Sequence, residues 1–583
     1  MLRDYKGLNE LYDLVEGKSK ATLIIKGGKV LNVYTEEVIE NADIAIYDDK
    51  IVKVGDCSSL LGKETKVLDV KEKFVVPGFI DSFLILESSM QTPATYARYA
   101  LSGGVTTIIL FPAPLYRLFK KEGIKFFEEE LSSTPVRFYY MVPLIADEKL
   151  SAILPDHETF VEFLLNKKVL GVLGFSKSLG ELDFKNVINQ YISDSILSGK
   201  PVGGIAPLDE KLIDVFSNLG LRFFTYIRSE KSAMKVLRNG GYLVLSLLDR
   251  WKLKEIIEMV IKNKVPTDGI VLSTGLLDIR ELSKGKHLSN LLSYIVNLGI
   301  DPIKAIKFLT VNPAGLFGIE NKIGSIAPGK LADIVVLKDL TKFEVYATIV
   351  DGNIVFSDNE FRISSKISSY PKYLTETIIY PKSLNSELLQ VNTTSGNNVK
   401  VRAIKVNNKN IYTEEEMVAL SVVKGKVMCD IMNDILHLSL VDRKGEYVQN
   451  AFVKGIGLKK GAMALTLNLG SNEIIAIGTN AKDMLEAINI LTKINGGISI
   501  VEDGRKLYSL PLPLAGFMSF EVTKQLFFET EALYKNLSKI GCKNEKSLLV
   551  ISTLSDVNIP KIRITRNGLF DVENGKFVET VIL

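Results

Sequence analysis

Histidine and cysteine are scarce in this chain. Only 3 of its 583 residues are histidine and 3 are cysteine. The cysteines, Cys57, Cys429 and Cys542, lie far apart and form no Cys-x-x-Cys pair. This distribution argues against a zinc site or a disulfide framework and predicts reduced thiols in a cytoplasmic protein. Because one isolated imidazole does not make a transition-metal site, metal centres rich in histidine are also disfavoured.

Long apolar runs and a strong charge imbalance are missing as well. No run approaches the ~20 apolar residues of a membrane span. The first residues, Met-Leu-Arg-Asp-Tyr-Lys, lead into a polar stretch and not into the apolar core of a signal peptide. The 72 basic and 68 acidic residues leave a net charge of +4. We therefore expect neither a nucleic acid nor a membrane as a partner.

What is present is a chain of ordinary globular composition. Its 583 residues suggest about three or four domains. Residues from about 21 to 75 form short apolar stretches, at 22–25, 30–33, 42–46 and 51–54, separated by polar residues. Lys26-Gly27-Gly28 predicts a turn between the first two of them. Strands paired through polar turns are typical of a small β-sheet domain.

From about residue 74 to residue 318 the pattern changes. Apolar stretches of four to six residues, such as 106–110, 138–142 and 269–272, alternate with longer amphipathic stretches. In residues 252–264 the apolar side chains mark one helical face. This alternation predicts the α/β class, with a parallel sheet closed into a TIM-like (β/α)8 barrel.

Residues 321–356 return to a strand-turn-strand pattern. We predict that they pair with the N-terminal strands, so that the barrel is inserted into the sheet domain. The predicted division is a composite β-sandwich domain at 1–75 with 321–365, a barrel at 76–320 and a C-terminal α/β domain at 366–583. Polar residues at 392–398 favour a loop or linker.

Several short motifs stand out along the chain. In the predicted barrel and sheet domains they lie at residues 77–81 (Pro-Gly-Phe-Ile-Asp), 86–90, 104–107, 312–314 and 327–333. In the C-terminal part they lie at residues 452–462, 478–480, 510–516 and 568–572. Together these motifs resemble the adenine deaminase family of the amidohydrolase superfamily. The resemblance implies an amidohydrolase barrel, hydrolysis of adenine to hypoxanthine and ammonia, a divalent metal (manganese or iron) as cofactor, and a homo-oligomer.

The chemistry of that family depends on metal-bound water. Bound divalent metals lower the pKa of water to about 7 and so supply hydroxide at neutral pH. Their imidazole and carboxylate ligands must lie at the carboxyl ends of the barrel strands. A His-x-His pair on one strand points both rings to the same side, because side chains alternate along a strand.

This chain departs from the family pattern at every ligand position. The His-x-His pair falls on Phe83 and Ile85, and a glutamate falls on Gly174. Two further histidines fall on Ile205 and Thr225, the second next to Tyr226. The other positions concerned are Gly275, where the family has an acid, and residues 468–473, where it has Ala-His-Asp-Ser-His-Asn. We therefore predict no metal cofactor for this copy.

A few polar residues could still line a remnant pocket for a purine base. The candidates are Asp81, Glu87, Ser88 and His287. Three of them have a structural alternative: Asp81 could cap a turn, Ser88 or Ser89 could cap the next helix, with Thr92 nearby, and His287 could begin a helix. The other histidines suggest structural roles, His157 at a helix start and His437 as a hydrogen-bonded strand residue.

Three hypotheses follow for the function. The chain could be a working adenine deaminase with an unusual site. It could be a degenerate member that keeps the fold but no metal. Such a member could bind a purine, or it could be a partner and regulator of an active relative. It could also be an enzyme that catalyses a metal-free reaction in the same barrel. Apolar replacement of buried ligands favours the second, because buried polar groups destabilise a fold unless they are paired.

Overall fold

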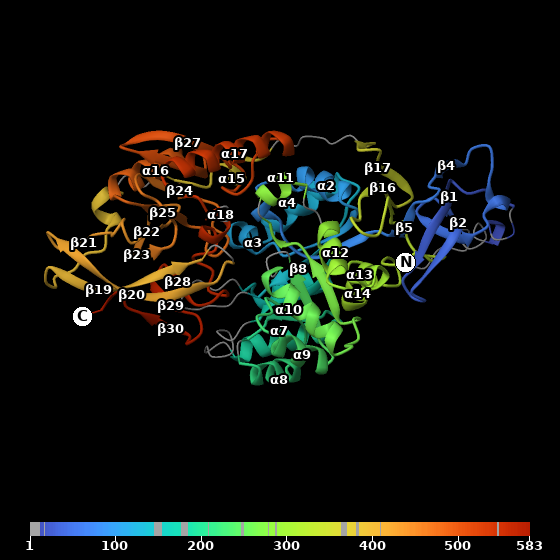
Figure 1. Ribbon diagram of the computed structural model, residues 1–583, viewed down its shortest axis with the longest axis horizontal. Helices are drawn as coiled ribbons and strands as arrows, with labels where there is room; N and C mark the ends of the chain where they lie inside the picture. Colours follow the sequence, from blue (N-terminus) through green and yellow to red (C-terminus); the bar gives the residue numbers. More distant parts are fainter. Residues whose placement is uncertain are drawn as a thin grey trace.

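The computed structural model describes residues 12–582 apart from residues 15, 17, 145–153, 176–184, 208, 247–249, 278, 286–287, 363–369, 380–383, 408–409 and 545–546. Three parts follow one another along the long axis of the molecule (Figure 1). A blue and yellow sheet lies at one end, a helix-covered barrel lies in the middle, and the orange and red C-terminal strands and helices lie at the other end. No helix in these ranges is both long and apolar enough to cross a membrane.

The first sheet combines strands from both sides of the barrel in the sequence. Its order is β18-β17-β16-β15-β5-β1-β2-β3, and β4 pairs with β1. The domain limits given above stay a prediction. The strands are β1 (Leu23–Asn32), β2 (Glu37–Tyr47), β3 (Lys50–Gly55), β4 (Lys66–Asp69), β5 (Phe74–Pro77), β15 (Ile334–Leu337), β16 (Val345–Val350), β17 (Asn353–Ser357) and β18 (Glu360–Phe361), and the 3-10 helix η1 (Ser58–Leu60) lies between β3 and β4.

The turn predicted at residues 26–28 is wrong, because β1 runs through them. The register against β2 shifts between Ile25 and Gly28 and again between Gly28 and Val30, as in a β-bulge. Gly27 has a φ of 70°, which suits a glycine, and its N–H donates to Asp43 Oδ1 at 2.9 Å. Two glycines in a strand thus mark a bulge here and not a chain reversal.

The central part is a nearly closed parallel barrel, which confirms the predicted α/β barrel. Its order is β13-β12-β11-β10-β9-β8-β7-β6-β14. Because β13 and β14 are separated by Thr274 alone, they act as one interrupted last strand beside β6. The strands are β6 (Phe79–Ile85), β7 (Val105–Leu110), β8 (Arg137–Pro143), β9 (Val169–Phe175), β10 (Val202–Ile205), β11 (Leu221–Thr225), β12 (Tyr242–Ser246), β13 (Ile270–Ser273) and β14 (Gly275–Leu276).

Helices cover the outside of the barrel. The predicted helix at residues 252–264 is α10, and its buried residues Leu253, Ile256 and Ile257 face the core. The helices are η2 (Leu86–Ser89), α2 (Pro93–Ser102), α3 (Ala113–Phe119), α4 (Lys121–Ser132), α5 (His157–Leu165), α7 (Lys185–Leu197), α8 (Lys211–Asn218), α9 (Glu230–Arg238), α10 (Arg250–Lys262), α11 (Ile279–Ser283), α12 (Leu288–Asn297), α13 (Pro302–Lys307) and α14 (Val311–Leu316).

The C-terminal part is built on a ten-stranded sheet and a separate three-stranded sheet. The larger sheet has the order β21-β20-β19-β23-β22-β25-β24-β26-β27, with β31 beside β19, and the smaller has the order β28-β29-β30. Its helical segments are α15 (Lys372–Thr375), η4 (Ser386–Leu389), α16 (Ala481–Lys493), α17 (Thr523–Lys539) and α18 (Ser547–Ile551). Its strands are β19 (Asn398–Val406), β20 (Thr413–Val423), β21 (Lys426–Val427), β22 (Ile435–Val441), β23 (Val448–Lys454), β24 (Ala462–Leu465), β25 (Ile474–Gly478), β26 (Gly497–Glu502), β27 (Arg505–Pro511), β28 (Ile562–Thr565), β29 (Gly568–Asp571), β30 (Lys576–Val578) and β31 (Val581–Ile582).

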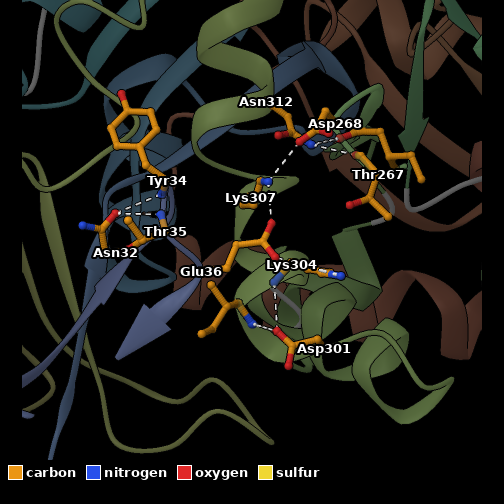
Figure 2. A network of polar contacts seen from close by, with 12 residues as sticks. Asn32, Tyr34, Thr35, Glu36, Thr267, Asp268, Asp301, Lys304, Lys307 and Asn312 are labelled. Carbon is orange, nitrogen blue, oxygen red and sulfur yellow. Dashed lines mark hydrogen bonds and ion pairs between the residues drawn. The ribbon is translucent and has the colours of Figure 1, made fainter. Parts of the chain in front are cut away.

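A polar network ties the first sheet to the amino-terminal end of the barrel (Figure 2). Lys307 Nζ at the end of α13 lies 2.8 Å from Glu36 Oε1 and 2.9 Å from Asp268 Oδ1. Asn312 in α14 donates to the carbonyl oxygens of Thr267 and Ile270, which hold the start of β13. These contacts lie at the opposite end of the barrel from the carboxyl ends of the strands, so they stabilise the scaffold and leave those ends to define the site.

Candidate functional site

The carboxyl ends of the barrel strands surround one small cavity, here called the barrel-mouth cavity. Its volume is about 40 Å³. Sites for small molecules usually offer about 300–1,000 Å³. The space enclosed by the described residues of the barrel mouth is therefore large enough for a few waters and too small for a heteroaromatic ring. It is lined by Phe83, Ile85, Phe111, Ala113, Pro114, Arg117, Leu173, Gly174, Ile205, Thr225, Tyr226, Leu469, Asp556 and Asn558.

Five of the six positions assigned above to former metal ligands lie in this wall. They are Phe83, Ile85, Gly174, Ile205 and Thr225. The sixth, Gly275, lies next to it, since a β-carbon built there would come within 3.9 Å of the Phe83 ring. The fold thus brings together residues up to 192 positions apart in sequence, from Phe83 to Gly275.

The His-x-His positions are filled with hydrocarbon. Phe83 and Ile85 project from the same side of β6 and are 3% and 7% exposed. The Phe83 ring packs against Phe111 and Tyr226, with ring centroids 5.8 Å and 6.3 Å apart. These aromatic contacts occupy the mouth of the barrel, and neither residue offers an atom that could bind a metal.

The two glycines have no room for a carboxylate. A β-carbon on Gly174 would lie 2.6 Å from the carbonyl oxygen of Leu144, and the φ of Gly174 is 133°. A β-carbon on Gly275 would lie 2.7 Å from the β-carbon of Ser246, and the φ there is 69°. Real β-carbons essentially never make contacts this short, so a side chain at either position would require its neighbours to shift.

The remaining two positions also lack metal ligands. Ile205 ends β10 and Thr225 ends β11. Thr225 is 2% exposed, and its hydroxyl oxygen finds no hydrogen-bond partner among the described residues. A hydroxyl in this position can hydrogen-bond to a cavity water, but a lone neutral hydroxyl does not hold a divalent cation.

The charged groups of the barrel-mouth cavity do not fit a catalytic metal either. Asp556 is the only carboxylate in its described wall, and Arg117 brings a positive charge to the same wall. No group of three histidine, cysteine, aspartate or glutamate side chains that could hold a metal ion occurs in the described ranges. Transition metals in such barrels require several imidazole or carboxylate ligands together, so the donor set does not match the family cofactor.

A loop of the C-terminal part closes over the mouth. Arg117 Nη1 donates to the carbonyl oxygen of Leu469 at 3.1 Å and to Asn472 Oδ1 at 3.2 Å. Asn472 Nδ2 donates in return to the carbonyl oxygen of Pro114 at 2.7 Å. Burial lowers the pKa of Arg117, while the charges of Asp556 and Glu473 act in the opposite direction. Residues 468–473, assigned above to a histidine-rich family motif, therefore act here as a hydrogen-bonded cover.

Asp81 and Ser88 hold the last strand of the barrel against the first. Asp81 is fully buried and accepts hydrogen bonds from the N–H of Thr274, at 2.9 Å, and from its hydroxyl. Burial raises the pKa of Asp81 to about 6, although the bonds from Thr274 act to lower it. Ser88 Oγ accepts from the N–H of Leu277 and donates to the carbonyl oxygen of Ile85. Neither side chain lines the barrel-mouth cavity.

Glu87 is buried behind the mouth. Its Oε1 accepts from the N–H of Leu115 at 3.1 Å, and its Oε2 has no hydrogen-bond partner among the described residues. Burial raises the pKa of Glu87 to about 7, while the Leu115 hydrogen bond and the Arg117 charge act to lower it. The cap of α2 is Thr92 and not Ser88 or Ser89, because the Thr92 side chain accepts from the N–H of Thr95, while both serines belong to η2.

The two histidines that the structure describes, His157 and His437, do not line the barrel-mouth cavity. His287 lies outside the described residues. His157 begins α5 as expected, and its Nε2 lies 2.9 Å from Asp194 Oδ2 on the surface. His437 lies in strand β22, but the expected hydrogen bond at its Nδ1 is absent among the described residues. Burial lowers the pKa of His437 to about 4, so its ring is neutral at pH 7.

Three polar residues of the barrel-mouth cavity could not be predicted from the sequence pattern. Arg117 belongs to a short helix without a motif, and Asp556 and Asn558 lie in a loop far along the chain. Their position depends on the contact between the C-terminal part and the barrel. A family alignment of the two parts together could have pointed to them, whereas periodicity and spacing could not.

Known proteins of two related families are similar to this chain. Residues 253–355 match the profile of the amidohydrolase family, and residues 410–576 match the adenine deaminase C-terminal domain. Adenine deaminase 1 of Carboxydothermus hydrogenoformans is 31% identical over 97% of this chain and 97% of its own length. An adenine deaminase of Clostridium botulinum is 29% identical over 98% of this chain and 97% of its own length. Among solved structures, molinate hydrolase matches with a TM-score of 0.47 and 18% identity over 60% of this chain and 98% of that chain.

The barrel, its strand order and the matched profile define a protein of the amidohydrolase class. The similarity over nearly the full length of the chain identifies the family within this class. The chain belongs to the adenine deaminase family.

Proposed function

We propose that this chain is a family member that has lost metal-dependent deamination and serves a non-catalytic role. The observation that carries the proposal is the pair Gly174 and Gly275. A β-carbon built on Gly174 would lie 2.6 Å from the carbonyl oxygen of Leu144, and one built on Gly275 would lie 2.7 Å from the β-carbon of Ser246. Both distances are too short for a side chain unless the neighbouring atoms shift. A site that had merely exchanged one ligand for another would keep room for a side chain at these positions.

Chemistry supports the same conclusion. The amino group of adenine is a poor leaving group on an aromatic ring, and water is too weak a nucleophile at neutral pH without activation. Metal ions supply that activation in the family, as metal-bound hydroxide. In this chain the corresponding wall is made of Phe83, Ile85 and Ile205, with Thr225 as its one hydroxyl among the former ligand positions. These groups can neither hold a metal nor take a proton from water.

The size of the cavity disfavours the other two hypotheses. A working deaminase or a metal-free enzyme must admit its substrate, and the space of about 40 Å³ that the described residues enclose is too small for a purine. Arg117 could supply charge to such a reaction, but its Nη1 already donates to the carbonyl oxygen of Leu469 and to Asn472 Oδ1, which hold the guanidinium against the cover. We therefore place no purine base in the barrel mouth.

Ammonia release tests the proposal. The purified chain, supplied with adenine and manganese, should release ammonia no faster than buffer. An adenine deaminase that carries the family histidines serves as the positive control in the same assay. Turnover that depends on manganese and is abolished by a chelator would contradict the proposal. Turnover unchanged by the chelator would favour the metal-free enzyme instead.

A further inference from the structure

A much larger cavity lies outside the barrel mouth, where the barrel meets the C-terminal part. Its volume is about 910 Å³, which falls in the range of about 300–1,000 Å³ that small-molecule sites occupy. Residues of α2 and α4 line it from the barrel, and residues 370–375 and 513–524 line it from the C-terminal part. We call it the α2–α17 groove.

One wall of the α2–α17 groove is aromatic. Tyr370 and Phe520 stack with ring centroids 5.2 Å apart and planes 8° apart. Tyr99 and Phe361 line the same groove. Phe520 keeps 47% of its surface exposed, so part of its ring is available for contact. A wall of this kind favours a flat ring as a ligand, because aromatic rings and bases stack on one another.

A buried carboxylate faces the same space. Glu130, at the end of α4, is 4% exposed and lines the groove. Its Oε2 accepts a hydrogen bond from the Tyr370 hydroxyl at 3.3 Å, and no ion pair of Glu130 occurs among the described residues. Buried carboxylates are unfavourable unless hydrogen-bonded, so the N–H groups of a ligand would stabilise this one.

Positive charge lies at other points of the lining. Arg98 of α2 lies over the Phe361 ring, with its guanidinium carbon 4.6 Å from the centroid. Lys524 lies in the first turn of α17, an end that no side chain caps. Both cations and the helix end favour an anionic group in their vicinity. The α2–α17 groove thus combines a stacking wall, an acceptor for N–H groups and a cationic region.

We propose that the α2–α17 groove binds a nucleotide with an amino-substituted base. The base stacks on Phe520, its amine donates to Glu130, and its phosphate lies toward Arg98 and Lys524. The inference rests on the groove alone and does not depend on whether the barrel mouth is catalytic. The ammonia-release assay tests the barrel mouth, and nucleotide binding tests the α2–α17 groove. Failure of one proposal therefore leaves the other unaffected.

Calorimetric titration of the full chain tests this assignment with AMP as the probe. Purine riboside 5′-monophosphate lacks only the amine, and inorganic phosphate lacks the base. AMP should bind more tightly than the amine-free nucleotide by about tenfold, in line with one hydrogen bond to a charged acceptor. Inorganic phosphate should give no measurable heat. Equal affinity for AMP and the amine-free nucleotide would overturn the role given to Glu130.

Single substitutions in the α2–α17 groove test where AMP binds. Phe520→Ala should weaken AMP affinity by about 5- to 100-fold through lost stacking. Lys524→Ala should weaken AMP with no such effect on adenosine, which lacks the phosphate. Phe528→Ala is the matched control, because Phe528 is an exposed phenylalanine of α17 outside the groove lining. Absence of AMP binding, or equal losses in Phe520→Ala and Phe528→Ala, would overturn the proposal.

Discussion

At the residue scale, Gly174 and Gly275 restrict the introduction of a metal ligand more than the apolar residues of the barrel mouth do. Phe83 and Ile85 could revert to histidine by changes of side chain alone. Gly174 could not regain an acid so simply, because its φ of 133° and the carbonyl oxygen of Leu144 leave no space for a β-carbon. Where neighbouring atoms lie this close to a glycine, any added side chain destabilises the fold.

Substitution of Gly174 tests this argument. Gly174→Ala should lower the free energy of unfolding by about 2–5 kcal/mol, through backbone strain together with the forced contact. Gly199→Ala is the matched control, since Gly199 also has a positive φ, 68°, but nothing lies within 4 Å of its added β-carbon. That variant should lose only about 1–2 kcal/mol. Equal losses in urea denaturation would show that Gly174 has room for a side chain.

Glu87 makes the stability of the fold depend on pH. Burial raises its pKa in the folded protein to about 7 from an ordinary value of 4.5. Between these values the folded state binds the proton more tightly than the unfolded state does. The stability from this group is therefore fully present below pH 4.5 and is lost as the pH rises through 7.

Glu87→Gln should remove this dependence. From pH 4.5 to pH 8 the parent chain should lose about 3 kcal/mol of unfolding free energy relative to the variant. Glutamine keeps an oxygen that can accept from the N–H of Leu115, so the hydrogen bond of the parent is retained. Chemical denaturation at a series of pH values measures the difference. Parallel pH profiles for the two proteins would mean that Glu87 is solvated in the folded state.

At the scale of elements, one buried carboxylate bridges the first and last strands of the barrel beside their backbone pairing. The last strand is interrupted at Thr274, and Asp81 of β6 accepts from both its N–H and its hydroxyl. Asp81 belongs to the family motif at residues 77–81, and its position is explained by this bridge. The residue therefore keeps a structural role that does not depend on a metal.

A double-mutant cycle measures this bridge. Asp81→Ala should lower the free energy of unfolding by about 1–3 kcal/mol, because it leaves the buried N–H of Thr274 without an acceptor. Thr274→Val removes only the hydroxyl and should have a smaller effect. The two changes together should lose less than the sum of the single losses. Additive losses would show that Asp81 and Thr274 do not interact.

The sequence predicted the elements whose residues repeat regularly. The apolar stretches at 106–110 and 138–142 lie within β7 and β8, and the amphipathic stretch at 252–264 overlaps α10. Features that depend on contacts distant in sequence could not be predicted in this way. The bulge at Gly27 requires Asp43 as an acceptor, and the split after β13 requires Asp81. In both cases a side chain on another strand stabilises a local irregularity.

At the scale of the whole molecule, the candidate site was predictable in part. Motif positions alone suggested Phe83, Ile85, Gly174, Ile205 and Thr225, and the structure brings all five to one cavity. The cover formed over the mouth by Arg117, Leu469 and Asn472 was not predictable, because it joins two parts of the chain about 350 residues apart. The same junction forms the α2–α17 groove.

The metal content of the purified chain tests the central claim most directly. The chain is produced with manganese and iron in the medium, dialysed against metal-free buffer and analysed by mass spectrometry of the elements. A histidine-bearing adenine deaminase treated in parallel shows that the procedure retains bound metal. Because Phe83, Ile85, Gly174 and Gly275 stand at positions assigned to metal ligands, the chain should carry far less than one ion per molecule. Two ions retained per chain would contradict the account.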